Sequence, residues 1–187
     1  MTDNPKAETP AKEKPAPLTA PPERLDKYAR GEIPLEELQQ SITGNEVMYI
    51  AEIGYNLFQQ GRYKDAKVIY DGLIALNTNV WYFHAALGAI QLEAHEAGFS
   101  DEGFSLDAAL ASLNRALELN PKDIASCVNR AEVYLYQSKI IEAVTDLKAA
   151  VEMDPEGKNE QSMRARRLAQ EMLKAIEREE NKKKENK

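Results

Sequence analysis

The sequence is poor in the side chains that most often carry catalysis or bind metals. Its 187 residues include one cysteine, Cys127, and two histidines, His84 and His95. A single cysteine cannot form an intrachain disulfide or a cysteine metal cluster, which fits a reducing compartment. The histidines make no HExxH motif. We therefore expect Cys127 to be a small buried side chain and the histidines to be ordinary helix residues.

Long apolar runs and an excess of positive charge are also missing. No segment approaches the roughly 20 apolar residues that span a bilayer. The start, residues 1–22, is polar and proline-rich and lacks the apolar run of a secretory signal. The formal net charge of -7 argues against general affinity for nucleic acid or an anionic membrane surface. We expect a cytoplasmic protein with a protein partner, no nucleic-acid ligand and no membrane insertion.

Motifs that would hold a nucleotide or a reacting group are absent as well. The glycines form neither GxGxxG nor GxxxxGK[ST], and no β-strand pattern is evident. Neighbouring carboxylates such as Glu36 and Glu37 point apart on a helix, so they do not form a catalytic pair. An enzyme is only the third hypothesis, and we predict no catalytic residues, no metal site and no cofactor.

What the sequence does contain is a repeat of 34 residues. Asn120–Pro121 and Asp154–Pro155 stand 34 positions apart, and each follows apolar residues at helical spacing. In an earlier copy, Gly54 and Ala66 are small where two paired helices would approach, and Gly61 suits the turn between them. The spacing predicts three helix-turn-helix repeats within residues 45–155, at about 47–80, 81–123 and 124–157.

The second repeat departs from this pattern. About nine extra residues separate its two helices, and the insertion holds Phe99 and Phe104 beside Gly98 and Gly103. One interpretation is a tolerated surface loop with its aromatic rings tucked under, because loops accept insertions at low free-energy cost. The other is a contact for a partner.

Composition predicts the segments outside the repeats. Residues 1–22 should be a disordered tail because they carry too little apolar surface to order themselves. Two apolar stripes in 23–44 predict short leading helices. Residues 158–180 predict a capping helix with a polar back, and 181–187 a charged, disordered tail. The predicted fold class is all-α, a solenoid of about three repeats with leading helices and a C-terminal capping helix.

The small, aromatic, glycine, alanine and proline positions resemble the tetratricopeptide repeat family from roughly Glu46 to Pro155. In that family the first helix of each pair lines a concave groove. The resemblance implies an apolar, aromatic groove that suits an extended peptide, unless some of these residues pack against the leading helices. The groove residues it implies are Met48, Ala51, Tyr55, Phe58, Tyr82, Ala85, Ala89, Leu92, Val128, Leu135 and Tyr136.

One subgroup of the family clamps the acidic carboxyl end of heat-shock chaperones with lysine, asparagine and arginine side chains. The matching positions here are Ala51, Tyr55, Ala86, Ala125 and Asn129. The lysines and arginines of that clamp are absent, so the resemblance predicts no activity of this kind.

The chain also resembles the class II chaperones of type III secretion, of the LcrH/SycD type, from about Leu25 to Ile176. The resemblance rests on the segments YARGEIPLEELQQSITGN, AEIGYNLFQQGRYKDAKVIYDGLIALN and NVWYFHAALGAIQ. It implies a chaperone whose groove holds a short proline-and-leucine motif of a translocator, and whose leading helices can mediate dimerisation. Ala51, the enlarged loop and the proline-rich start depart from the pattern of that group.

Two functions are therefore predicted for a non-catalytic, protein-binding chain. The first is a cytosolic secretion chaperone that holds a translocator or another secreted client in its groove. The second is a general scaffold or adaptor that joins subunits of an assembly through the convex face or the Gly98–Phe104 loop. The sequence leaves open the identity of the client, the main contact surface, and whether the chain is a homodimer.

Overall fold

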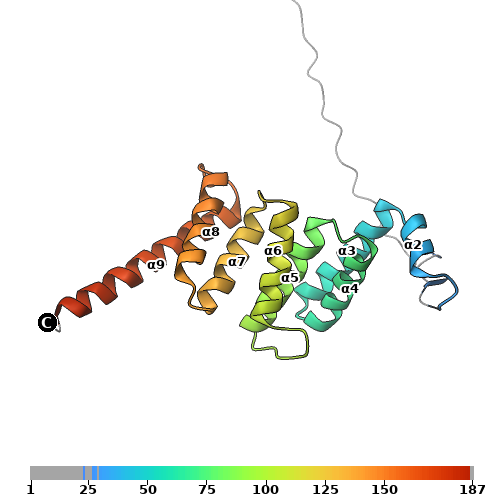
Figure 1. Ribbon diagram of the computed structural model, residues 1–187, viewed down its shortest axis with the longest axis horizontal. Coiled ribbons are helices and arrows are strands. Elements are labelled where there is room, and N and C mark those ends of the chain that lie inside the picture. Colours follow the sequence, from blue (N-terminus) through green and yellow to red (C-terminus); the bar gives the residue numbers. More distant parts are fainter. Residues whose placement is uncertain (1–22, 24–26, 29, 186–187) are drawn as a thin grey trace, which may run out of the picture.

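The computed structural model describes residues 23, 27–28 and 30–185 of the chain (Figure 1). The predicted tail over 1–22 lies outside the described residues. Every regular element in the described part is a helix, which confirms the all-α fold.

Six helices form three pairs that follow one another along the molecule (Figure 1). Before them comes a short helix, α2 (Leu35–Ser41), and after them a long one, α9 (Glu160–Glu185). From α3 onward, each helix contacts the next. The pairs are α3 (Gly44–Gln59) with α4 (Tyr63–Leu76), α5 (Trp81–Glu96) with α6 (Leu106–Leu119), and α7 (Ile124–Tyr136) with α8 (Ile140–Met153).

Caps and prolines mark the ends of these helices. Thr43 and Glu46 form a capping box at the start of α3, in which the Thr43 N–H donates to Glu46 Oε2 at 2.7 Å. Asp123 caps α7 by accepting a hydrogen bond of 2.9 Å from a backbone N–H of the first turn. Pro121 and Pro155 follow the ends of α6 and α8, as the repeat period predicts.

Small residues let the paired helices approach closely. A Cβ on Gly54 would lie 2.8 Å from Ile69 Cγ2 and 2.9 Å from Tyr70 Cε2, so only glycine fits between α3 and α4. The turn after α3 places Gly61 at a φ of 71°, and the turn after α7 places Ser138 at 59°. The turn at Gly61 lies where the sequence predicts it.

The hydrophobic core is divided into three clusters, each shared by successive helices. The first joins α3, α4 and α5 around Tyr70 and Phe83. The second joins α5, α6 and α7 around Leu113. The third joins α6, α7, α8 and α9 around Leu147, and it includes the buried Cys127. Because no repeat closes a cluster alone, the repeats form one continuous solenoid.

The enlarged loop of the second repeat connects α5 and α6 and packs on the first repeat. The ring centroids of Phe99 and Phe104 are 4.9 Å apart, and Phe99 also meets Tyr63 at 5.8 Å. An ion pair of 2.9 Å joins Lys64 Nζ to Asp101 Oδ2. Both phenylalanines are half-buried, so the loop has its aromatic rings tucked under.

The last helix is longer than the predicted capping helix. Residues 181–185, predicted to belong to a disordered tail, are helical as part of α9. The reason is that lysine and glutamate are good helix formers, so a run of charges need not end a helix. Ala165 is fully buried against the third pair, and Leu168 and Met172 pack on the same cluster, as the predicted apolar stripe requires.

Candidate functional site

The first helices of the repeats lie side by side and form one face of the solenoid. α3 contacts α5, α5 contacts α7, and α7 contacts α9. Among the described residues, no such contact joins α4 with α6 or α6 with α8. The second helices are therefore further apart than the first ones, so the stack curves and the face of α3, α5 and α7 is the concave one.

Four of the predicted groove residues are large and exposed on these three helices. Met48 is 60% exposed, Tyr55 49%, Tyr82 37% and Tyr136 51%. Single exposed apolar side chains are common on soluble proteins. Here they stand on first helices that touch one another, so they give the concave face an apolar, aromatic character.

Three of the predicted groove residues are not exposed. Ala51 is 2% exposed, Leu92 3% and Val128 0%, and all three belong to the core clusters. The Ala51 carbonyl accepts a 3.1 Å hydrogen bond from Tyr70 Oη, which shows that this side of α3 faces α4. The prediction was wrong for these three positions. The first helix of each repeat has two apolar sides, one toward the groove and one toward the core, and these residues lie on the side toward the core.

The remaining predicted residues are half-buried. Ala85 and Ala89 lie on α5 and leave room beside Tyr82, and Leu135 packs on the third cluster. The Phe58 ring lies between Tyr55, at 6.5 Å, and Tyr63, at 6.3 Å between centroids. Phe58 therefore supports the groove from the core side rather than standing free.

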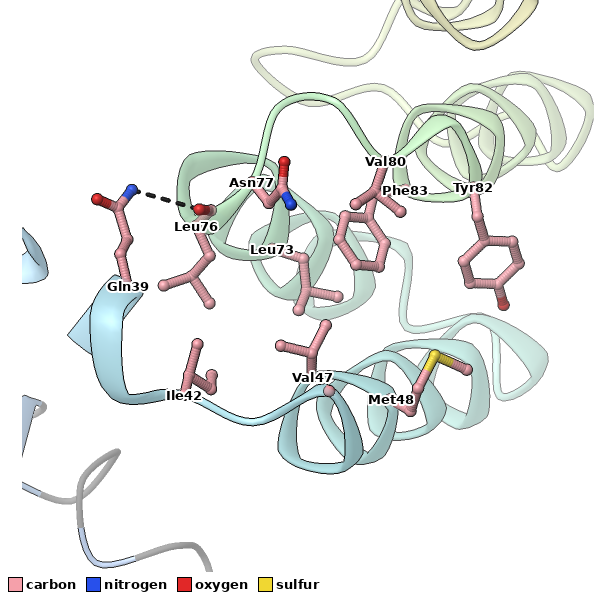
Figure 2. Close-up of a pocket in the computed structure, with 11 residues that line it drawn as sticks. Gln39, Ile42, Val47, Met48, Leu73, Leu76, Asn77, Val80, Tyr82 and Phe83 are labelled. Atoms are coloured by element: carbon pink, nitrogen blue, oxygen red, sulfur yellow. Dashed lines mark hydrogen bonds between the residues drawn. The ribbon is translucent and has the colours of Figure 1, made fainter. Parts of the chain in front are cut away.

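An apolar cavity of about 640 Å³ opens beside Met48 and Tyr82 (Figure 2). Gln39 Nε2 donates to the Ala75 and Leu76 carbonyls at 2.8 and 3.3 Å, which ties α2 to the end of α4 along one side of it. Helical periodicity could not reveal this cavity because its walls come from α2, α3, α4, α5 and the segments that connect them, and not from one helix. It is lined by Gln39, Ile42, Gly44, Val47, Met48, Leu73, Leu76, Asn77, Val80, Tyr82 and Phe83.

The other end of the concave face is polar and mostly acidic. Arg164 Nη2 of α9 donates to Glu132 Oε2 at 2.7 Å, and Tyr136 Oη donates to Glu96 Oε1 at 3.3 Å. Burial raises the pKa of Glu132 to about 7, Arg164 opposes this shift, and Glu96 adds to it. Burial and the nearby Glu96 also raise the pKa of Glu93. The groove thus changes from aromatic at α3 to acidic near α9.

The Glu132→Gln variant should lose a pH dependence that the wild-type chain shows. The carboxyl binds its proton more tightly when folded, with a pKa of about 7 against 4.5. Its contribution to stability is fully present below pH 4.5 and is lost as the pH rises through 7, because the unfolded chain releases the proton first. Urea unfolding between pH 4.5 and 8 should show a steeper decline of the free energy of unfolding in the wild type than in the variant, which keeps the contribution of Glu93. If the free energy of unfolding changed with pH in the same way in both proteins, this role of Glu132 would be contradicted.

The two histidines and the cysteine, which are the side chains most often used in catalysis, are packed against other parts of the fold. His84 Nε2 lies 2.9 Å from the Thr78 carbonyl oxygen, and the His95 ring packs against Tyr136 at 5.2 Å. Burial raises the pKa of the Cys127 thiol to about 11, so it stays protonated at neutral pH. Within the described residues, no three acidic, histidine or cysteine side chains are placed to hold a metal ion. No helix there combines the length and apolarity needed to span a bilayer.

Comparisons with known proteins agree with this architecture. Residues 124–156 match the family model described as tetratricopeptide repeat. Sperm-associated antigen 1 of Rattus norvegicus is 31% identical over 127 residues, which is 67% of this chain. The match spans only 12% of the length of that relative, so it concerns the repeats and not the whole protein.

Solved structures share the fold over most of the chain. The type III secretion chaperone SycD of Yersinia enterocolitica, in complex with a peptide of the translocator YopD, has a TM-score of 0.60 and 21% identity, covering 75% of this chain and 98% of its own. The first tetratricopeptide repeat domain of Spaghetti (RPAP3), bound to the HSP90 peptide SRMEEVD, has a TM-score of 0.59 and 17% identity, covering 72% and 96%. The chain therefore contains a tetratricopeptide repeat, and its fold is similar to that of type III secretion translocator chaperones.

Proposed function

We propose that the chain is a non-catalytic, cytosolic chaperone of type III secretion that holds a translocator or another secreted client in its concave groove. The observation that carries this proposal is the row of exposed side chains Met48, Tyr55 and Tyr82, which continues into the apolar cavity. The similarity of fold to SycD, which was solved with a translocator peptide, supports the choice of client.

Such a groove would hold its client by burying a few apolar side chains reversibly. An extended segment of the client would lie across α3 and α5, with an aliphatic side chain in the cavity between Met48 and Tyr82. Full burial of one leucine contributes about 1.5–3 kcal/mol. The exposed tyrosines add contact area, and their hydroxyls can donate to carbonyl groups of the client. Release needs no chemical step.

The second candidate function is a scaffold that binds other subunits through the opposite face. Val68 on α4 is 64% exposed and Ile141 on α8 is 80% exposed, and both stand on second helices. A partner seated there would leave the groove free. The Gly98–Phe104 loop is a weaker candidate because it packs on the first repeat. A homodimer contact through the leading helices remains a prediction.

The double variant Met48→Ala/Tyr55→Ala should lose binding to the client while its fold is kept. Both side chains are at least 49% exposed, so their truncation removes groove contacts and little core. Phe58 is left in place because its half-buried ring belongs partly to the core. We expect at least a tenfold rise in Kd, measured by calorimetry with the purified client, and an unchanged circular dichroism melting curve.

The matched control is Ile141→Ala, which removes an exposed apolar side chain from the opposite face. The client can be found by affinity capture from the native cytosol, with bound proteins identified by mass spectrometry. A secreted, membrane-active protein retained by wild type and control but lost with the double variant supports the chaperone. Capture of a cytoplasmic complex that only Ile141→Ala weakens supports the scaffold and removes the groove from the mechanism.

A further inference from the structure

We propose that residues 15–22 of the chain bind in its own apolar cavity beside Met48 and Tyr82, and so compete with the client for the groove. This inference rests on the proposed function, because it assigns a second occupant to the same surface. When no client is present, this segment of the same chain would cover the apolar surface of the groove.

The composition of residues 15–22 suits an aromatic groove. The segment reads PAPLTAPP, in which four of the eight residues are proline. Proline restricts φ to about -65° and favours polyproline II, which has three residues per turn. Pro15, Leu18 and Pro21 would then share one side of the segment. Apart from Met1, Leu18 is the one large apolar side chain that the sequence has before residue 23.

The cavity has the chemistry that such a segment needs. Its wall is apolar and includes Val47, Leu73 and Phe83, and Tyr82 contributes an aromatic ring (Figure 2). Grooves lined by aromatic residues are the usual receptors for polyproline II segments, which lose little conformational entropy on binding. A volume of about 640 Å³ lies within the usual range of ligand pockets.

The cavity also offers a hydrogen-bond donor. The Asn79 N–H donates to Asn77 Oδ1 at 3.0 Å, which fixes the orientation of the Asn77 amide. Figure 2 shows the amide nitrogen of Asn77 on the side of Leu73, among the residues that line the cavity. The backbone carbonyls of polyproline II make no internal hydrogen bonds, so they can accept from this nitrogen.

The described chain before α2 lines a second cavity, which shares Leu73 and Leu76 with this one. Tyr28 lies with Leu76 around a smaller cavity of about 190 Å³, and Leu76 also lines the larger one. Glu23 Oε1 is 2.8 Å from Lys27 Nζ, so residue 23 lies beside Lys27, the residue that precedes Tyr28. Leu18 precedes Glu23 by five residues, which is roughly 15 Å of polyproline II at about 3.1 Å per residue.

A tether this short makes even weak binding effective. Short linkers give effective concentrations in roughly the millimolar range. A segment with a Kd of about 1 mM would therefore occupy the cavity about half of the time. The client would have to displace it, and a client with micromolar affinity would do so readily.

The test measures how well a free peptide competes with the tethered segment. The probe is a synthetic peptide of the sequence PAPLTAPP, titrated into the full chain to millimolar concentration. Trp81 is the single tryptophan, and its ring centroid lies 6.1 Å from that of the lining residue Tyr82, so its fluorescence is used to follow binding. The Leu18→Asp variant should bind the peptide about twofold more tightly than wild type, because its own segment no longer occupies the cavity half of the time.

The matched control is Thr19→Asp, which adds the same charge on another side of the polyproline II turn and should bind the peptide like the wild type. Equal Kd values for wild type and Leu18→Asp would overturn the inference, as would no binding by either. A difference that disappears on tenfold dilution of the protein would place the segment in the groove of a second copy and also overturn it.

The proposed function fails by a different result. It fails if Met48→Ala/Tyr55→Ala retains the client, whatever the peptide does. If the client depends on the groove but Leu18→Asp changes nothing, the chaperone function stands and only the self-covering segment is lost.

Discussion

Replacing Gly88 with alanine is expected to lower the free energy of unfolding by about 2 kcal/mol, because it overpacks the contact between α5 and α6. A Cβ at this position would lie 2.6 Å from Leu113 Cγ and 3.3 Å from the Ala109 carbonyl oxygen. Leu113 is fully buried in the second core cluster, so its side chain has no open space to move into. The two helices would have to separate instead.

Gly72→Ala is the matched control, and it should raise the free energy of unfolding where Gly88→Ala lowers it. Gly72 lies inside α4, is exposed, and has no atom within 4 Å of an added Cβ. Alanine there should stabilise the chain by about 0.5–1 kcal/mol through its better helix propensity. Urea unfolding of the two variants measures both effects. A Gly88→Ala chain as stable as the wild type would show that the close contact between α5 and α6 is not required.

The Arg130→Met variant is expected to lose about 3–5 kcal/mol, the largest effect among these substitutions. Arg130 Nε and Nη2 each donate to an oxygen of Asp146 at 2.7 Å, and Nη1 donates to Asn114 Oδ1 at 2.9 Å. The guanidinium therefore joins α6, α7 and α8. Only 7% of the Asp146 side chain is exposed, so removing the arginine would leave a buried carboxylate without its counter-charge.

Arg115→Met tests whether burial causes this loss. Arg115 pairs with Glu118 at 3.0 Å, but the two side chains are 40% and 64% exposed. Its removal should cost less than about 1 kcal/mol. The double variant Arg130→Met/Asp146→Leu should recover most of the stability, because apolar residues can replace a buried ion pair at little cost. If chemical denaturation gave equal losses of unfolding free energy for Arg130→Met and Arg115→Met, burial of the ion pair would not be the cause of the larger loss.

The repeat architecture could be predicted from local pattern because each repeat carries its own signals. Gly54 is small where α3 meets α4, and Pro121 and Pro155 follow helix ends, so a sequence period was enough to find the pairs. The register within each first helix was harder. Ala51, Leu92 and Val128 are apolar at helical spacing, but so are the exposed groove residues, and periodicity does not tell which side of the helix faces the core.

Features that depend on distant parts of the chain could not be predicted. The apolar cavity needs α2 held against the end of α4 by Gln39, and no pattern in the sequence announces that contact. The same is true of the bond from Arg164 to Glu132, which joins α9 to α7. The aromatic half of the candidate site was therefore predictable, whereas its cavity and its acidic end were not.

The division of the core among neighbouring helices has a mechanical consequence. A force applied between α3 and α9 must pass through several helix-to-helix interfaces, because among the described residues no core cluster contains side chains of both helices. Small displacements at each interface therefore add along the stack, as they do in a spring. The curvature of the concave face can change through many slight rotations while every helix keeps its own hydrogen bonds.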